Sequence, residues 1–153
     1  MKNPMNLQER IREELKEAVR REDRVRRSAL RLILAGIRNA EIAQQRELDD
    51  AGVIDVLTKE VKQRRESIEA FRHGNRQDLV AQEEAELAVI LEYLPEPMTR
   101  EEIVALVQKT IAETGAKGPG DKGKVMGQLM PQVKGRAEGK EVSTIVSELL
   151  ASL

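Results

Sequence analysis

The chain of 153 residues contains no cysteine and no tryptophan, and it has only one Phe, one Tyr and one His. Without cysteine there can be no disulfide, zinc–thiolate finger, iron–sulfur cluster or thiol nucleophile. A single histidine also excludes a site built from several histidines, so we expect no metal ion and no other cofactor. The scarcity of aromatic side chains disfavours binding of single-stranded nucleic acid, which depends on base stacking.

Long apolar runs are missing as well. The N-terminal stretch MKNPMNLQERIREEL has no apolar core of the signal-peptide type, and no later run is long enough to span a bilayer. We therefore expect no membrane association and a cytoplasmic location.

What remains is a chain of 40% apolar and 35% charged residues, typical of a soluble helical protein. Apolar residues recur at helical spacing and nowhere alternate as in a strand, so we expect an all-α fold. Pro95-Glu96-Pro97 marks the domain boundary, because two prolines stop a helix. The prediction is an N-terminal all-α domain of helical hairpins (1–95) and a small C-terminal all-α domain of three helices (96–153).

Local signals place the ends of several helices. The predicted helices cover about 6–21, 23–48, 53–73 and 76–94, then one after Thr99, one over 121–133 and one over 140–151. Thr99 with Glu102 forms a capping box, Asp121 is expected to cap the next helix, and Gly74 to end the third. Gly36, inside the second helix, predicts a close helix–helix approach.

The most informative segment is Gly115 to Lys140. It contains seven of the ten glycines, and six basic residues against two acidic ones, in a chain of formal net charge −1. Glycines let a backbone approach another molecule closely, and uncompensated cations favour an anionic one. The segment also offers helix N-termini, which attract phosphate.

These features predict an interface with a folded nucleic acid that is recognised by its shape and phosphates. The candidate phosphate contacts are Lys117, Lys122, Lys124, Lys134, Arg136 and Lys140. The candidate close-approach residues are Gly123, Gly127, Gly135 and Gly139.

Other patterns have simpler interpretations, and we assign no catalytic residue. Residues 118–124 fit the phosphate-loop pattern GxxxxGK, but Val125 replaces the Ser or Thr that binds magnesium, and the motif follows a helix instead of a strand. His73 fits a helix C-terminus. Six arginines surround the first helix junction, and we interpret them as solvated helix faces paired with nearby acids, rather than as a phosphate-binding patch. They are Arg20, Arg21, Arg24, Arg26, Arg27 and Arg31.

Three stretches make the pattern specific: GKVMGQLMP at 123–131, KGRAEGK at 134–140 and the run from Val142 to Leu150. Together they resemble the GatB/YqeY family, whose stand-alone members match this chain in length. The part from about Met98 resembles the tail domain of the B subunit of the glutamine-dependent aminoacyl-tRNA amidotransferase. Glu138 departs from the family pattern, which often has Asp, a better N-cap, at this position.

The resemblance implies a tail-type helical fold and a tRNA-binding, non-catalytic role. In the amidotransferase the tail contacts the outer elbow of the tRNA, while other domains carry out the chemistry. The implied partners are tRNA and subunits of the amidotransferase or an aminoacyl-tRNA synthetase. Two alternatives stay open: an adaptor of that machinery without RNA contact, or carbon–nitrogen ligase activity with glutamine as amido donor inside a larger complex.

Overall fold

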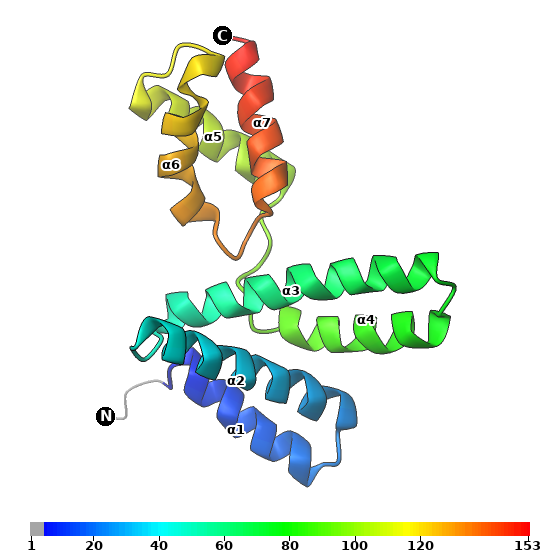
Figure 1. Cartoon of the computed structure of the whole chain (residues 1–153). Coiled ribbons are helices and arrows are strands. Elements are labelled where there is room, and N and C mark those ends of the chain that lie inside the picture. Colours follow the sequence, from blue (N-terminus) through cyan, green and yellow to red (C-terminus); the bar gives the residue numbers. More distant parts are fainter. Residues whose placement is uncertain (1–4) are drawn as a thin grey trace. The chain divides into compact units, whose positions relative to one another are not determined.

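The computed structural model describes residues 5–153, which form seven α-helices, one short 3₁₀ helix and no β-strand (Figure 1). The prediction of an all-α fold is confirmed. The helices form two compact units, one ending at Leu94 and the other beginning at Pro95, and each has its own hydrophobic core. None of the described helices is long and apolar enough to cross a membrane.

Unit 1 consists of two helical hairpins (Figure 1). Helix α1 (Leu7–Arg20) packs along α2 (Arg24–Gln44), and α3 (Asp50–His73) packs along α4 (Gln77–Leu91). Helix α2 joins the hairpins by packing against both α3 and α4. Apart from Tyr93, the buried core is aliphatic, and its fully buried members include Ile11, Leu30, Ile33, Ile37, Val53, Leu57 and Ile90.

Short polar side chains begin the first three helices. The Asn6 side-chain oxygen accepts from the Glu9 N–H at 2.8 Å, and an Asp23 carboxylate oxygen accepts from the Arg26 N–H at 3.1 Å. Asp49 caps α3 in the same way. Such caps satisfy N–H groups that have no partner inside the helix.

Gly36 lies where α2 approaches α3. A Cβ at this position would lie 3.0 Å from Cγ1 of Val56, closer than side chains normally pack. The predicted close approach of two helices is confirmed.

The end of α3 differs from the prediction. Gly74 has an ordinary φ of −81°, and the left-handed residue is Asn75, with a φ of 58°. The Arg76 N–H donates to the Phe71 carbonyl at 2.8 Å, which closes the turn around Asn75. Asn tolerates this conformation better than other side chains do, so the helix reverses one residue later than the glycine suggested.

A buried charged pair joins α3 to α4. Nη1 of Arg64 donates to the Glu86 carboxylate, and it also donates to Oε2 of Glu83 at 3.0 Å. Arg64 is only 5% exposed and Glu86 only 4%. Removing one partner of such a pair leaves an uncompensated buried charge and costs about 3–5 kcal/mol. The pair therefore ties one turn of α3 to one turn of α4.

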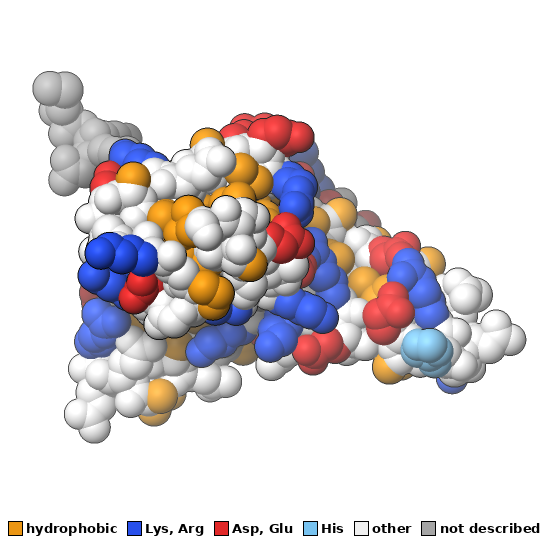
Figure 2. Space-filling model, turned by 90° about the horizontal axis from the view of Figure 1, so that it is seen from above, with side chains coloured by type: hydrophobic (Ala, Val, Ile, Leu, Met, Phe, Trp, Pro, Cys, Tyr) orange, Lys and Arg blue, Asp and Glu red, His pale blue; other side chains and the backbone are white. Residues whose placement is uncertain are grey.

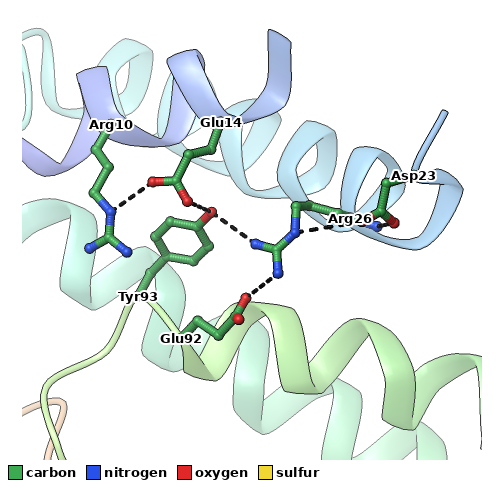
Figure 3. Close-up of polar contacts among 6 residues, drawn as sticks. All are labelled: Arg10, Glu14, Asp23, Arg26, Glu92 and Tyr93. Carbon is green, nitrogen blue, oxygen red and sulfur yellow. Dashed lines mark hydrogen bonds and ion pairs between the residues drawn. The ribbon is translucent and has the colours of Figure 1, made fainter. Parts of the chain in front are cut away.

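Tyr93, just after α4, connects three helices (Figure 3). Its hydroxyl donates to Oε1 of Glu14 at 2.8 Å and accepts from Nη1 of Arg26 at 3.3 Å. Arg26 also binds Glu92 at 2.6 Å, and the Arg10 guanidinium lies 4.9 Å from the centre of the tyrosine ring. Burial raises the pKa of Tyr93 to about 12, and the hydrogen bond to the Glu14 carboxylate acts in the same direction.

Unit 2 is a three-helix domain. Its helices α5 (Arg100–Thr114), α6 (Lys122–Val133) and α7 (Gly139–Ala151) each pack against the other two. A 3₁₀ turn over Pro119–Asp121 leads into α6. The core consists of Ile103, Val107, Val125, Leu129, Val133, Val142, Ile145, Val146 and Leu150.

The raised pKa of Tyr93 can be measured directly, because the chain has one tyrosine and no tryptophan. We expect tyrosinate absorbance to titrate with a midpoint of about 12 in the native protein. In denaturant the midpoint should fall to about 10. The unfolded chain thus loses this proton first, so the stabilisation is complete below about pH 10 and is lost between about pH 10 and 12.

The variant Glu14→Gln serves as the control for this titration. It removes the carboxylate that faces the phenol, so the native midpoint should fall toward that of the unfolded chain. Equal midpoints for native and denatured wild-type protein would show that the phenol is neither buried nor bound to Glu14.

Candidate nucleic-acid interface

The six predicted basic residues all lie in unit 2, in two groups at opposite ends of α6. We call the first the N-terminal lysine group; it consists of Lys117, Lys122 and Lys124. The second consists of Lys134, Arg136 and Lys140, in and after the turn that leads from α6 to α7. Four of the six are exposed, and Lys122 and Arg136 are half-buried. The length of α6 separates the groups by about 17 Å, so they do not converge on one point.

The loop before α6 is closed by Asp121. Gly115 ends α5 in the left-handed conformation, with a φ of 71°. Farther along, Oδ2 of Asp121 accepts from the Lys117 N–H at 2.9 Å. Asp121 occupies the N-cap position of α6, as predicted, but its side chain makes no capping bond to the helix because the carboxylate serves the preceding loop instead.

The exposed face of α6 carries two glycines. A Cβ at Gly123 or Gly127 would meet no atom within 4 Å. Glycine inside a helix costs about 1 kcal/mol relative to alanine, and here no internal contact requires it. Lys124 is exposed on this side, and α6 contains no acidic residue. The result is a flat helix surface with bare backbone and one protruding cation.

Pro131 removes a backbone donor from the same face. Proline has no N–H, so the Gly127 carbonyl, four residues earlier, lacks its usual helical donor. Both residues are exposed. Sequence reasoning overlooked this carbonyl, although a proline four residues after a glycine inside a helical pattern is a visible signal.

Arg136 holds unit 2 together. Its Nε donates to the Glu96 carbonyl at 2.9 Å, and its Nη2 lies 3.4 Å from Oε2 of Glu102. Its own carbonyl accepts from the Met98 N–H at 2.9 Å. These bonds fix the entering segment against the turn after α6, so the structure gives this guanidinium a structural task in addition to any ligand contact.

The four predicted close-approach glycines separate in the structure. Gly123 and Gly127 are open to solvent, as described. Gly135 has a φ of 77°, and so serves the turn between α6 and α7. A Cβ on Gly139 would lie 3.5 Å from the terminal methyl of Met130, an ordinary internal contact. Only the first two therefore form an accessible glycine face.

The structure does not support the phosphate-loop interpretation of 118–124. This segment runs from the end of a helix through a 3₁₀ turn into α6, with no strand before it. Val125, at the position where magnesium would require a hydroxyl, is fully buried in the core.

Unit 1 offers a different cleft of about 340 Å³, between α1, α2 and the end of α4. Charged side chains that line this cleft form ion pairs with one another, for example Arg10 with Glu14 and Arg26 with Glu92. Among residues 5–153, no cluster of three or more His, Cys, Asp or Glu side chains is arranged to hold a metal ion. We therefore keep the α6 face as the candidate site.

Figure 2 shows basic and acidic side chains interspersed over one face, and many surface cations pair with acids. No ion pair joins the side chains of the N-terminal lysine group to the described residues. Two of its members lie in the first turn of α6, where the helix dipole disfavours cations. An anion bound there would relieve both the dipole and the mutual repulsion.

Comparison with known proteins places this site in a family context. The family model for the Yqey-like protein matches residues 8–150. The curated protein "Altered inheritance of mitochondria protein 41, mitochondrial" of Pyrenophora tritici-repentis is 32% identical over 145 residues, which are 94% of this chain and 80% of that protein. Its counterpart in Kluyveromyces lactis is 32% identical over 146 residues, 93% of this chain and 73% of the relative.

The protein of the same name in Lachancea thermotolerans is 38% identical over 112 residues, which are 71% of this chain but only 60% of the relative. The family match covers both units, so the similarity is to Yqey-like proteins as a whole and not specifically to an amidotransferase tail. None of these three names mentions an amidotransferase or a transfer RNA.

These names correct the expectation of a cytoplasmic protein, because each of the relatives is named as mitochondrial. The expectation rested on the missing apolar signal peptide and membrane span. Those features report on secretion and membrane insertion, whereas mitochondrial targeting uses amphipathic, Arg-rich segments without a long apolar run.

The open space around Gly127 predicts that adding a methyl group there stabilises the protein. Gly127→Ala should raise the free energy of unfolding by about 0.5–1 kcal/mol, because alanine restricts the unfolded chain and favours the helix. Denaturant unfolding measures this change. The matched control is Gly135→Ala, which should destabilise by a similar amount because of its positive φ. A loss of stability in Gly127→Ala would mean that the glycine serves the fold.

Proposed function

The chain belongs to the Yqey-like protein family, and we propose that it binds folded RNA of the transfer RNA class through the exposed face of α6, without a reaction of its own. The observation that carries the proposal is the bare backbone at Gly123 and Gly127. Each glycine weakens the helix and makes no internal contact in return, as expected where another molecule approaches.

The charges around this face favour an anionic ligand. The N-terminal lysine group forms no ion pair with the described residues and surrounds the start of α6, where free N–H groups and the dipole attract phosphate. The second group lies about 17 Å away, so phosphates several nucleotides apart would be contacted rather than one. Such spacing suits a polynucleotide better than a small phosphate ester.

The Gly127 carbonyl supports RNA over DNA. It lacks its helical donor because of Pro131 and lies on the open glycine face. A ribose 2′-hydroxyl can donate to such an acceptor, and DNA has no equivalent group. The choice of tRNA among RNAs rests on the resemblance of the segment from Met98 to the amidotransferase tail domain.

A second candidate is an adaptor that binds a protein of the amidotransferase or synthetase machinery without touching RNA. The same Gly123-x-x-x-Gly127 spacing that exposes backbone to RNA also lets a second helix pack closely. The two candidates differ in their dependence on salt, since phosphate contacts release counterions and helix packing does not.

We expect the purified full chain to bind bulk tRNA with an affinity that falls steeply as salt is raised. Replacing the N-terminal lysine group by alanine should weaken binding and reduce the slope of log affinity against log salt by about one for each phosphate that is no longer neutralised. Fluorescence anisotropy at several salt concentrations measures both effects.

The matched control replaces Arg12, Lys59 and Lys62, which are exposed on α1 and α3 and form no ion pair with the described residues. Arg136 is left intact, because its removal would also break bonds inside unit 2. Salt-independent binding would favour the adaptor. An equal weakening in the control, or no binding at low salt, would contradict the proposal.

Pro131→Ala tests the carbonyl separately. Alanine supplies the missing N–H, so the Gly127 carbonyl should become bonded within α6 and the helix should gain stability. We expect the preference for tRNA over double-stranded DNA of equal length to shrink while affinity for DNA is unchanged. An unchanged preference would show that this acceptor does not contact ribose.

A further inference from the structure

Helix α2 carries an apolar stripe on its outer side. Val25, Leu32 and Ile42 are 39%, 47% and 69% exposed. They belong to a series that recurs every three or four residues, as in a helix that packs on another helix. The series is Val25, Ser28, Leu32, Ala35, Asn39 and Ile42.

The fold leaves this stripe uncovered within unit 1. Helix α2 buries Ala29, Leu30, Ile33 and Ile37 against α1, α3 and α4, which occupy its opposite side. From Val25 to Ile42 the outer stripe runs for about 26 Å, long enough to contact more than four turns of a second helix. Isolated exposed apolar residues are common, but three large ones aligned along one side of a helix are typical of an interaction site.

One edge of the stripe is a row of arginines. Arg24, Arg31 and Arg38 are exposed and stand seven residues apart, so they lie on one line along the helix. No ion pair joins any of them to the described residues. By contrast, Arg20 and Arg21 of the same basic cluster both pair with Glu17. The sequence-based interpretation of these arginines as paired with nearby acids thus fails for Arg24 and Arg31, and Arg38 was not included in it.

The outer face of α2 also has no acid to balance the row. The only acidic residue in α2 is Glu41, which is half-buried and accepts from the Leu48 N–H at 2.9 Å. The face is therefore apolar along its centre and purely basic along one edge.

We propose that this face binds a helix of a partner protein whose own apolar stripe is flanked by acidic residues. Apolar contact would cover Leu32 and Ile42, and the acids would lie opposite the arginine row, as charges flanking a packed seam do. Asn39, inside the stripe, would fix the register of the pair, since a lone polar residue there specifies alignment. This inference uses unit 1 alone and does not depend on RNA binding by α6.

A second copy of this chain fits less well. In an antiparallel pair of α2 helices the two arginine rows would face one another, and like charges repel. In a parallel pair the row would face the flank of Gly36 and Ala43, where α2 has no acid and the nearest described carboxylate, that of Glu60, belongs to α3. RNA also fits less well, because the apolar stripe gives phosphates nothing to contact.

The test uses the full chain and a synthetic helical peptide of about three heptads, with leucine at the seam positions and glutamate at the flanking positions. A second peptide has lysine in place of each glutamate. We expect anisotropy titrations to show binding of the acidic peptide and not of the basic one. Leu32→Ser with Ile42→Ser should weaken binding at least about tenfold.

A charge exchange sharpens the test. Replacing Arg24, Arg31 and Arg38 by glutamate should abolish binding of the acidic peptide and create binding of the basic one. The matched control makes the same change in net charge at Arg12, Lys59 and Lys62, which are exposed on α1 and α3 and form no ion pair with the described residues. The control should leave both titrations unchanged, and circular dichroism checks that each variant is folded.

Three outcomes would overturn the proposal. The first is failure of the acidic peptide to bind, or binding that the Leu32 and Ile42 changes do not affect. The second is self-association of the wild-type chain, measured by sedimentation, that the same two changes abolish, because a second copy would then be the occupant. The third is a loss of tRNA binding when the three arginines are replaced by glutamate but not when Leu32 and Ile42 are replaced by serine. That result would show that the arginine row binds RNA.

Discussion

The burial of one stripe of α6 determines what unit 2 presents to other molecules. Val125, Leu129 and Val133 are all fully buried and recur every four residues, so they lie on a single side of the helix. Each contributes about 1.5–3 kcal/mol through burial against α5 and α7. This packing fixes the rotation of α6 about its axis. Gly123, Lys124 and Gly127 face outward only because the opposite side is held in this way.

Helices α2 and α6 are both packed on one side and open on the other, but their open sides differ in kind. The outer side of α2 carries large apolar side chains and a row of arginines. The outer side of α6 carries two glycines, where its backbone is accessible, and beside them Lys124 and Pro131. The first suits contact with side chains of another helix, and the second suits contact with an extended or irregular surface. The two open faces therefore differ in the class of ligand that each would suit.

Sequence reasoning succeeded where a signal is local. The all-α class, the cap at Thr99, whose hydroxyl accepts from the Glu102 N–H at 3.1 Å, and the close approach at Gly36 follow from local residue patterns. It failed where a side chain is recruited from a distance. Arg136 binds a carbonyl forty residues earlier in the chain, and no local pattern contains that information.

Other errors arose where two residues compete for one local role. Asp121 closes the preceding loop in place of capping α6, and Asn75 takes the left-handed position beside a glycine. Both residue types suit either role, so composition alone cannot choose between them. The four candidate glycines show the same limit. Gly135 and Gly139 serve the fold, whereas Gly123 and Gly127 are open to solvent, and the sequence pattern did not distinguish them.

The composition of α6 also has a consequence for folding. Twelve residues that include Gly123, Gly127 and Pro131 would be unstructured as a free peptide in water, since even alanine-rich helices of this length are marginal. The face exists only while the core of unit 2 holds the helix in place, so this helix should be among the first parts of unit 2 to open. A ligand that binds the α6 backbone would bind only the state in which α6 is folded onto unit 2. The free energy of unfolding of unit 2 would therefore rise with ligand concentration. Occupancy would thereby set how long the protein resists proteolysis, and its abundance would follow the supply of its ligand.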